Sequence, residues 1–193
     1  AGAEVSAEAA ARLIRNDLQM QSAMSASELA RLTTPMEPAG AKVRYDAAWL
    51  AAQPAPRGGP EWHCLAEALY FEARGESIRG QFAVAEVILN RVDSSRFPDT
   101  VCGVITQGTG RRFACQFTYT CDGRAEVITE PAAWHTVGKV ARAMLDGAPR
   151  RLTGGATHYH TGSVAPRWSR VFPRTATIGY HHFYRQPQRV RGN

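Results

Sequence analysis

Apolar positions recur at helical spacing through the middle of the chain. Residues 61–74 read EWHCLAEALYFEAR, and Gly75 is placed to end that helix in a left-handed conformation. Ser77 can cap a second helix, IRGQFAVAEVILNRV, whose apolar residues lie on nearly every face. A short helix through Ile105 and a longer one within EPAAWHTVGKVARAMLDG, ended by Gly147, follow. The pattern predicts helices packed around one core.

The helical period stops after residue 150. GGATHYHTGSVAPRW and TATIGYHHFYR are aromatic and β-branched and are interrupted by Gly and Pro, which favours strands or irregular structure. Between the helices, FACQFTYTCDG carries another strand-like segment that ends in an Asp-Gly turn. The predicted class is therefore α+β and mainly helical, with a small β or irregular element.

The first sixty residues have a different character. Residues 4–32 carry apolar side chains at roughly helical spacing in an Ala-rich background. Residues 33–60 hold five of the eleven prolines among Ala and Gly, which is typical of a linker. We expect three parts: an N-terminal helical extension and linker at 1–60, a folded domain at 61–186 and a basic tail at 187–193.

Composition narrows the class of protein. Hydrophobic residues make up 44% and charged residues 21%, which argues against both wholesale disorder and a membrane protein. No apolar run approaches the length of a spanning helix, so we expect no transmembrane segment. The formal charge of +6 favours polyanionic partners such as wall polymers, nucleic acid or anionic lipid. Because the basic residues are scattered and no nucleic-acid-binding motif is present, we do not expect nucleic acid.

The four cysteines lack paired C-x-x-C spacing, which favours disulfides in an oxidising compartment over a structural zinc site. Cys115 and Cys121 bracket a β-prone pentapeptide that would suit a short hairpin, so we expect them to pair and to leave Cys64 for Cys102. The alternative is four buried thiols in a cytosolic protein. Disulfides imply a periplasmic or secreted protein whose signal peptide has been removed, and we expect a monomer.

One carboxylate stands in the apolar face of the helix at 61–74. It is Glu72, which lies within about 60° of three apolar residues of the preceding turns, Leu65, Ala68 and Leu69. Apolar surroundings raise the pKa of a carboxyl group, and a carboxyl that is still protonated near neutral pH can act as a general acid. The alternative is that Glu72 ends a core stripe and reaches water, or pairs with Arg74 or Arg91.

Several separated motifs resemble one family. LAEALYFEARGES followed by GQFAVAEVILNRV resembles the spore cortex-lytic type of bacterial cell-wall hydrolase, in which an acid-Ala-Arg-Gly-acid cluster precedes Gly-Gln and a buried helix ending in Asn-Arg. CQFTYTCDG, ATHYHTG and IGYHHFYR resemble later segments of that family in the same order, so the resemblance covers about residues 61–185. It implies a lysozyme-like fold related to lytic transglycosylases, peptidoglycan glycan strands as substrate, no cofactor and Glu72 as the catalytic acid.

The chain departs from the spore enzymes outside that region. Residues 1–60 do not resemble the peptidoglycan-binding repeat of the family, and the cysteines suit a Gram-negative periplasm. We therefore expect a general wall-remodelling enzyme that cleaves the MurNAc-GlcNAc β-1,4 bond.

Glycoside hydrolysis usually requires two carboxylates, and a second one is hard to find. Glu76 follows the end of the helix and is interpreted as a group that orients the loop, whereas Asp122 sits in a Cys-Asp-Gly turn, where Asp is common for backbone reasons. A lytic transglycosylase needs only one acid. In that reaction Glu72 protonates the glycosidic oxygen and then, as a base, takes the proton from the muramyl C6 hydroxyl that closes a 1,6-anhydro ring. The sequence favours this reaction over hydrolysis.

Saccharide contacts are expected from polar and aromatic side chains of the strand-like segments. For the aromatic residues, packing in the core is the alternative. The candidates are Gln116, Tyr119, His158, Tyr159 and His160, together with Glu76 and Asp122.

Two other functions stay open. His158 and His160 share one face of a predicted strand, and with His181 and His182 they would suit a zinc-dependent amidase or peptidase. No H-E-x-x-H spacing supports that function, so we expect no metal. The basic charge also suits a non-catalytic module that holds wall polymer.

Overall fold

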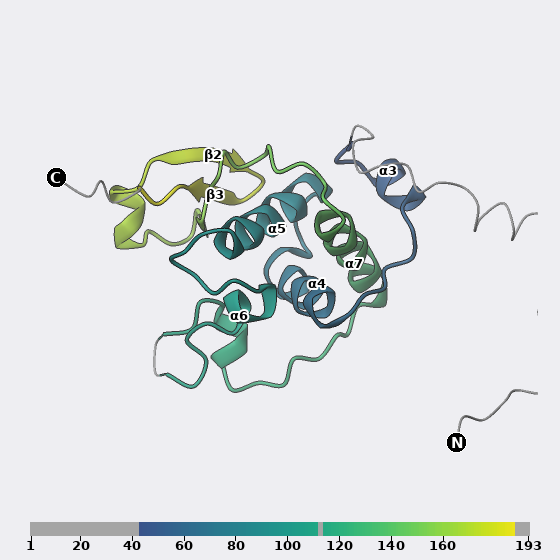
Figure 1. Ribbon diagram of the computed structural model, residues 1–193, viewed down its shortest axis with the longest axis horizontal. Helices are drawn as coiled ribbons and strands as arrows, with labels where there is room; N and C mark the ends of the chain where they lie inside the picture. Colours follow the sequence, from purple (N-terminus) through teal and green to yellow (C-terminus); the bar gives the residue numbers. More distant parts are fainter. Residues whose placement is uncertain (1–42, 112–113, 188–193) are drawn as a thin grey trace, which may run out of the picture. The chain divides into compact units, whose positions relative to one another are not determined.

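The computed structural model describes residues 43–111 and 114–187, which belong to one unit of helices and a small sheet (Figure 1). The expected helical extension at 4–32 and most of the basic tail lie outside the described residues, and the expected domain boundaries stay predictions. None of the described helices has the length and apolar character that a membrane span requires.

Two long helices carry most of the apolar core. Helix α4 (Pro60–Ala73) begins with proline in its first turn, where the missing N–H costs no hydrogen bond. Helix α5 (Ile78–Val92) begins at the predicted cap Ser77, whose hydroxyl accepts a hydrogen bond from the Gly80 N–H at 3.2 Å. Ten residues of α5 are buried, which agrees with its apolar sequence. The two helices pack against each other.

The ends of two helices differ from each other. Helix α7 (Pro131–Leu145), which packs against α4 and α5, is followed by Gly147 with a φ of 94°, the left-handed conformation that the sequence predicts. Helix α4 instead ends at Ala73, and Gly75 is not among the glycines with positive φ. The predicted left-handed end at Gly75 is therefore wrong. The chain turns there because the Glu76 N–H donates to the Ala73 carbonyl at 2.9 Å.

The short helix α6 (Val101–Ile105) is fastened to α4 in two ways. A disulfide joins Cys64 to Cys102, whose Cα atoms lie 5.3 Å apart, and this confirms the predicted pairing. In addition, the Glu61 carboxylate accepts a hydrogen bond from the N–H of Val101 at 2.6 Å. Both links join the N-terminal part of α4 to the N-terminal part of α6.

The second predicted disulfide, between Cys115 and Cys121, is also present. It closes a loop that contains the 3-10 helix η1 (Thr118–Cys121), so the predicted strand or hairpin is wrong. The N–H and the hydroxyl of Thr120 both donate to the Phe117 carbonyl, at 3.3 and 2.9 Å. The alternating pattern that suggested a strand here belongs to one tight turn, in which the aromatic side chains of Phe117 and Tyr119 are buried.

The β element is an antiparallel sheet in the order β1-β3-β2, formed by β1 (His158–Thr161), β2 (Arg174–Ile178) and β3 (His181–Tyr184) (Figure 1). Tyr159 pairs with Phe183, and Thr161 pairs with His181. Both β1 and β2 contact α5, so the sheet lies against the helical part. This arrangement confirms a mainly helical α+β fold with a small β element.

A buried carboxylate links α5 to the segment that leads into β1. Glu86 is 1% exposed, and its oxygens accept hydrogen bonds from the N–H groups of Leu152 and Thr153, both at 2.9 Å, and from the Thr153 hydroxyl at 2.5 Å. The Thr175 hydroxyl donates in turn to the Thr153 carbonyl at 2.6 Å. One glutamate therefore fixes the path of the chain into the sheet.

Residues 43–60, which the sequence places in the linker, include helix α3 (Ala47–Ala52). Leu50 of this helix is buried, and the ring of Trp49 packs edge-on against Phe82 with centroids 6.0 Å apart. This part of the expected linker thus packs against the helical core.

Candidate active site

The proposed catalytic acid lies beside an open pocket. Glu72 occupies the last turn of α4, is partly buried, and lines a pocket of about 940 Å³. The opposite walls of the pocket come from the β1 end at 161–163 and the β2–β3 turn at 179–182. The helical stripe that places Glu72 among apolar residues therefore ends at an open pocket.

The environment of Glu72 favours the protonated carboxyl. Burial raises its pKa, while a hydrogen bond from the Tyr159 hydroxyl to Oε2 at 3.1 Å and the positive charge of Arg91 lower the pKa by less, so the net shift is upward. Glu72 forms no salt bridge among the described residues. Arg74 pairs with Glu130 instead, at 2.8 Å.

Tyr159 reaches Glu72 because of its position in β1. Side chains alternate between the two faces of a strand, so Tyr159 points away from the face that carries His158 and His160. Its ring packs edge-on against His181 with centroids 5.0 Å apart. Burial raises the pKa of Tyr159 well above the ordinary value for a phenol, so its hydroxyl stays a hydrogen-bond donor throughout the physiological range.

Arg91 is a buried cation beside this pair. It is 3% exposed, its Nε donates to the Thr157 carbonyl at 2.7 Å, and its guanidinium lies over the rings of Phe97 and Phe117 at 5.5 and 5.4 Å. Burial lowers its pKa to about 10, which still leaves it charged at neutral pH. Its Nη1 has no hydrogen-bond partner in the described part of the chain. The sequence offered Arg91 only as a possible ion-pair partner, because no pattern in one helix reveals which charge it will face.

Glu76 holds one wall of the pocket in place. Its side chain is 6% exposed, and Oε1 accepts a hydrogen bond from the Tyr180 N–H at 3.1 Å and lies 2.9 Å from His181 Nδ1. A Cβ atom at Gly179, where φ is 57°, would lie 1.9 Å from the other carboxylate oxygen. Glu76 thus bridges the end of α4 to the β2–β3 turn, and the roles expected for it, in orienting the loop and in saccharide contact, stay predictions.

Tyr119 and Gln116 do not line the pocket of Glu72. Tyr119 is 9% exposed and stacks on Phe71, the neighbour of Glu72, with centroids 4.7 Å apart. Its hydroxyl is buried without a partner among the described residues, and burial raises its pKa. Gln116 is partly buried in the disulfide loop. Saccharide contacts by these two residues stay predictions. The burial of Tyr119 agrees with the alternative, in which the aromatic side chains pack in the core.

The remaining candidates do not line that pocket either, although His160 packs beside His182, which does. Asp122 is exposed, and its carboxylate accepts a hydrogen bond from the Arg124 N–H at 2.9 Å, which is the backbone role typical of Asp in a turn. His158 packs against Trp168 with centroids 5.0 Å apart, and burial lowers its pKa to about 4. His160 stacks on Tyr184 at 5.2 Å.

The two imidazoles share one face of β1, as predicted, since both His158 and His160 contact Trp168. However, the described residues contain no group of three or more His, Cys, Asp or Glu side chains arranged to hold a metal ion. They therefore offer no ligand set for the zinc-dependent alternative.

Replacing Tyr159 with Phe should move the alkaline limb of the pH–rate profile to higher pH. The hydroxyl lowers the pKa of Glu72, so its loss raises that pKa further. A general acid works while protonated, and the rate falls as the pH rises through its pKa, so a higher pKa extends activity upward. We also expect a rate about tenfold lower at the optimum, from one lost hydrogen bond to a charged group. Kinetics of cleavage of the expected glycan substrate from pH 4 to 9 would measure both effects.

Tyr45→Phe is the matched control, because Tyr45 packs against Phe82 and does not line the pocket. An alkaline limb that stays in place or moves to lower pH in Tyr159→Phe would show that this phenol does not lower the pKa of Glu72.

Two solved structures are similar to this protein in fold and in sequence. The catalytic domain of the germination-specific lytic transglycosylase SleB from Bacillus anthracis is 34% identical, with a TM-score of 0.54 over 68% of this chain and 99% of that one. The catalytic domain of the SleB protein from Bacillus cereus is 35% identical, with a TM-score of 0.53 over 68% of this chain and 95% of that one.

Curated relatives point the same way. The spore cortex-lytic enzyme of Halalkalibacterium halodurans is 40% identical over 123 residues, which are 62% of this chain and 33% of that protein. The corresponding enzyme of Oceanobacillus iheyensis is 39% identical over 121 residues, 62% of this chain and 39% of that protein. The chain thus matches well under half the length of these relatives. The cell wall hydrolase family model matches residues 75–184, more than half of the chain. Together with the two solved structures, this match confirms the resemblance seen in the sequence, and the chain belongs to the cell wall hydrolase family.

Proposed function

We propose that this protein cleaves the MurNAc-GlcNAc β-1,4 bond of peptidoglycan as a lytic transglycosylase, with Glu72 as acid and then base. The observation that carries the proposal is a carboxyl group with a raised pKa that lines an open pocket. Of the two solved relatives, the one from Bacillus anthracis is described as a lytic transglycosylase, which supports the same reaction class.

The first step requires a proton on Glu72. The protonated carboxyl donates to the glycosidic oxygen as the bond breaks and an oxocarbenium-like centre forms on the muramyl sugar. This leaves a carboxylate in a partly buried site. The Tyr159 hydroxyl, 3.1 Å from Oε2, and the buried charge of Arg91 then stabilise the negative form.

The second step uses that carboxylate as a base. It takes the proton of the C6 hydroxyl as this oxygen attacks the anomeric carbon and closes the 1,6-anhydro ring, so the nucleophile comes from the substrate. Hydrolysis would instead need a second group to activate water. The other carboxylates that line the pocket are occupied, since Glu76 holds the β2–β3 turn and Glu130 pairs with Arg74. This arrangement favours transglycosylation.

Both disulfides suit an envelope compartment, which is where the proposed substrate lies. We extend the proposal to a wall-remodelling enzyme of the periplasm or cell exterior. The curated relatives are spore cortex-lytic enzymes, and the cortex is one form of the same polymer.

The test is mass spectrometry of fragments released from purified peptidoglycan by the wild-type protein. Transglycosylation gives muropeptides lighter by one water than the hydrolytic products, because the anhydro ring replaces a reducing end. Reducing ends would point to hydrolysis. Peptides free of sugar, released in a reaction that a chelator stops, would indicate the amidase alternative, and no release at all would favour the binding module.

A further inference from the structure

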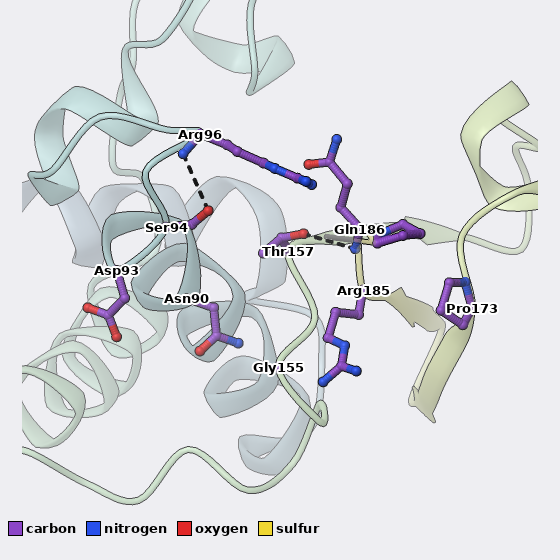
Figure 2. A pocket seen from close by; sticks show the side chains of 10 residues that line it. Asn90, Asp93, Ser94, Arg96, Gly155, Thr157, Pro173, Arg185 and Gln186 are labelled. Carbon is purple, nitrogen blue, oxygen red and sulfur yellow. Dashed lines mark hydrogen bonds between the residues drawn. The ribbon is translucent and has the colours of Figure 1, made fainter. Parts of the chain in front are cut away.

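A second pocket lies at the other end of α5 from Glu76. It measures about 650 Å³ and is lined by residues from the end of α5, the segment before β1 and the segment after β3 (Figure 2). Helix α5 has 15 residues and is therefore about 22 Å long. Thr157 precedes β1 and Arg185 follows β3, whereas Thr161 and His181, which line the pocket of Glu72, lie at the opposite ends of these strands. This pocket is separate from the site of Glu72.

Two arginines give this pocket its charge. Arg96 and Arg185 are both exposed, and Figure 2 shows their side chains extending along opposite parts of the lining. Within the described residues neither has a carboxylate within 4.0 Å of a guanidinium nitrogen. The pocket also contains Asp93, but that carboxylate is paired with Arg150. The lining therefore has excess positive charge that no described residue neutralises.

The polar groups between the arginines are held in fixed positions. The Asn90 side-chain amide donates to the Ala156 carbonyl at 2.9 Å, and the Thr157 hydroxyl accepts a hydrogen bond from the Gln186 N–H at 3.4 Å. Asn90 belongs to α5, and Thr157 directly precedes β1. A rigid wall of amides and hydroxyls beside two guanidinium groups suits a ligand that carries both carboxylates and amide groups.

We propose that this pocket is an accessory site for the peptide stems of peptidoglycan, whose carboxylates bind Arg96 and Arg185. The inference rests on the proposed function for its substrate. A stem peptide also brings N–H groups and carbonyls that the amide and hydroxyl groups of this wall can bind, whereas a phosphate-rich polymer brings only negative charge. The stems project from the same glycan that Glu72 cleaves, so this pocket would hold the polymer while the bond is cut at the other end of α5.

Binding to insoluble peptidoglycan tests the proposal, measured with Glu72→Gln as the parent so that the polymer stays intact. Adding Arg96→Gln and Arg185→Gln should weaken binding roughly tenfold, as expected for two exposed charge contacts. The matched control adds Arg79→Gln and Arg124→Gln, which remove the same charge from exposed positions outside this pocket and should leave binding within about twofold. Arg96→Lys with Arg185→Lys keeps the charge and should recover part of the affinity. Thermal unfolding of each protein checks its fold.

Two further ligands identify the source of the negative charge. On glycan strands stripped of their peptides, the parent and the double Gln variant should bind alike, because the stems are gone. Polyphosphate should compete poorly with intact peptidoglycan for the parent. Equal losses in the double variant and the control, a loss that persists on stripped strands, or strong competition by polyphosphate would each overturn the proposal. Because the parent cannot cleave by the proposed route, these outcomes are independent of whether the wild type releases anhydro products.

Discussion

Replacing Glu72 with Gln should lower the rate of glycan cleavage by about 10³-fold or more, the scale expected when a positioned general acid is lost. The amide has nearly the same shape, and its oxygen can still accept the hydrogen bond of Tyr159. It has no acidic proton to give to the glycosidic oxygen and cannot later act as a base. Soluble fragments released from purified peptidoglycan per unit time would measure the effect.

Glu67→Gln is the matched control for this change. Glu67 lies on the same helix, does not line the pocket and approaches His63 at 3.9 Å. We expect this variant to keep most of the wild-type rate. The melting temperature of Glu72→Gln should equal or exceed that of the wild type, because a neutral amide is easier to bury than a carboxylate. If Glu72→Gln kept more than a tenth of the rate, the proton would have to come from another group.

The largest effect on stability is expected for Glu86→Ala, which should lower the free energy of unfolding by about 3 to 5 kcal/mol. The change removes the acceptor for two N–H groups and one hydroxyl of Leu152 and Thr153, and Thr153 is itself fully buried. Water cannot easily take the place of the lost oxygens. Urea unfolding at neutral pH, followed by circular dichroism, would measure the difference.

Glu126→Ala controls for the loss of a carboxylate, since Glu126 is exposed. Its effect should stay within about 0.5 kcal/mol. The loss of stability in Glu86→Gln should fall between those of Glu86→Ala and Glu126→Ala. The amide oxygen can still accept hydrogen bonds, but the amide NH₂ group would face N–H or O–H donors of Leu152 and Thr153. A loss below about 1 kcal/mol for Glu86→Ala would mean that the segment around Thr153 finds other partners.

The helices and the position of Glu72 could be predicted because they depend on local patterns. A capping serine, a proline in a first turn and the 3.6-residue period act within a few residues. The helical period alone therefore places Glu72 on the same stripe as Leu69. The predicted strand around Phe117 was wrong because its short alternation also suits a 3-10 turn, and only the surrounding fold decides between them.

The partners of Glu72 could not be derived from the sequence. Tyr159 is 87 residues away along the chain, and whether its hydroxyl reaches Glu72 depends on which face of β1 is turned toward α4. The sequence selected Tyr159 for saccharide contact, which stays a prediction, and gave no sign that its hydroxyl would donate a hydrogen bond to Glu72. The same limit applies to Arg91, whose burial follows from the packing of α5 against elements that come later in the chain.

The pairing of β1 with β3 makes catalysis more fragile than folding. A shift of β1 by a single residue would turn Tyr159 outward and present a histidine to Glu72, while the helical core around α4, α5 and α7 stayed intact. Such a protein would be soluble, helical by spectroscopy and inert toward glycan. Screens that rank variants of this enzyme by yield or melting temperature would therefore miss this kind of failure, and only an assay that detects bond cleavage would find it.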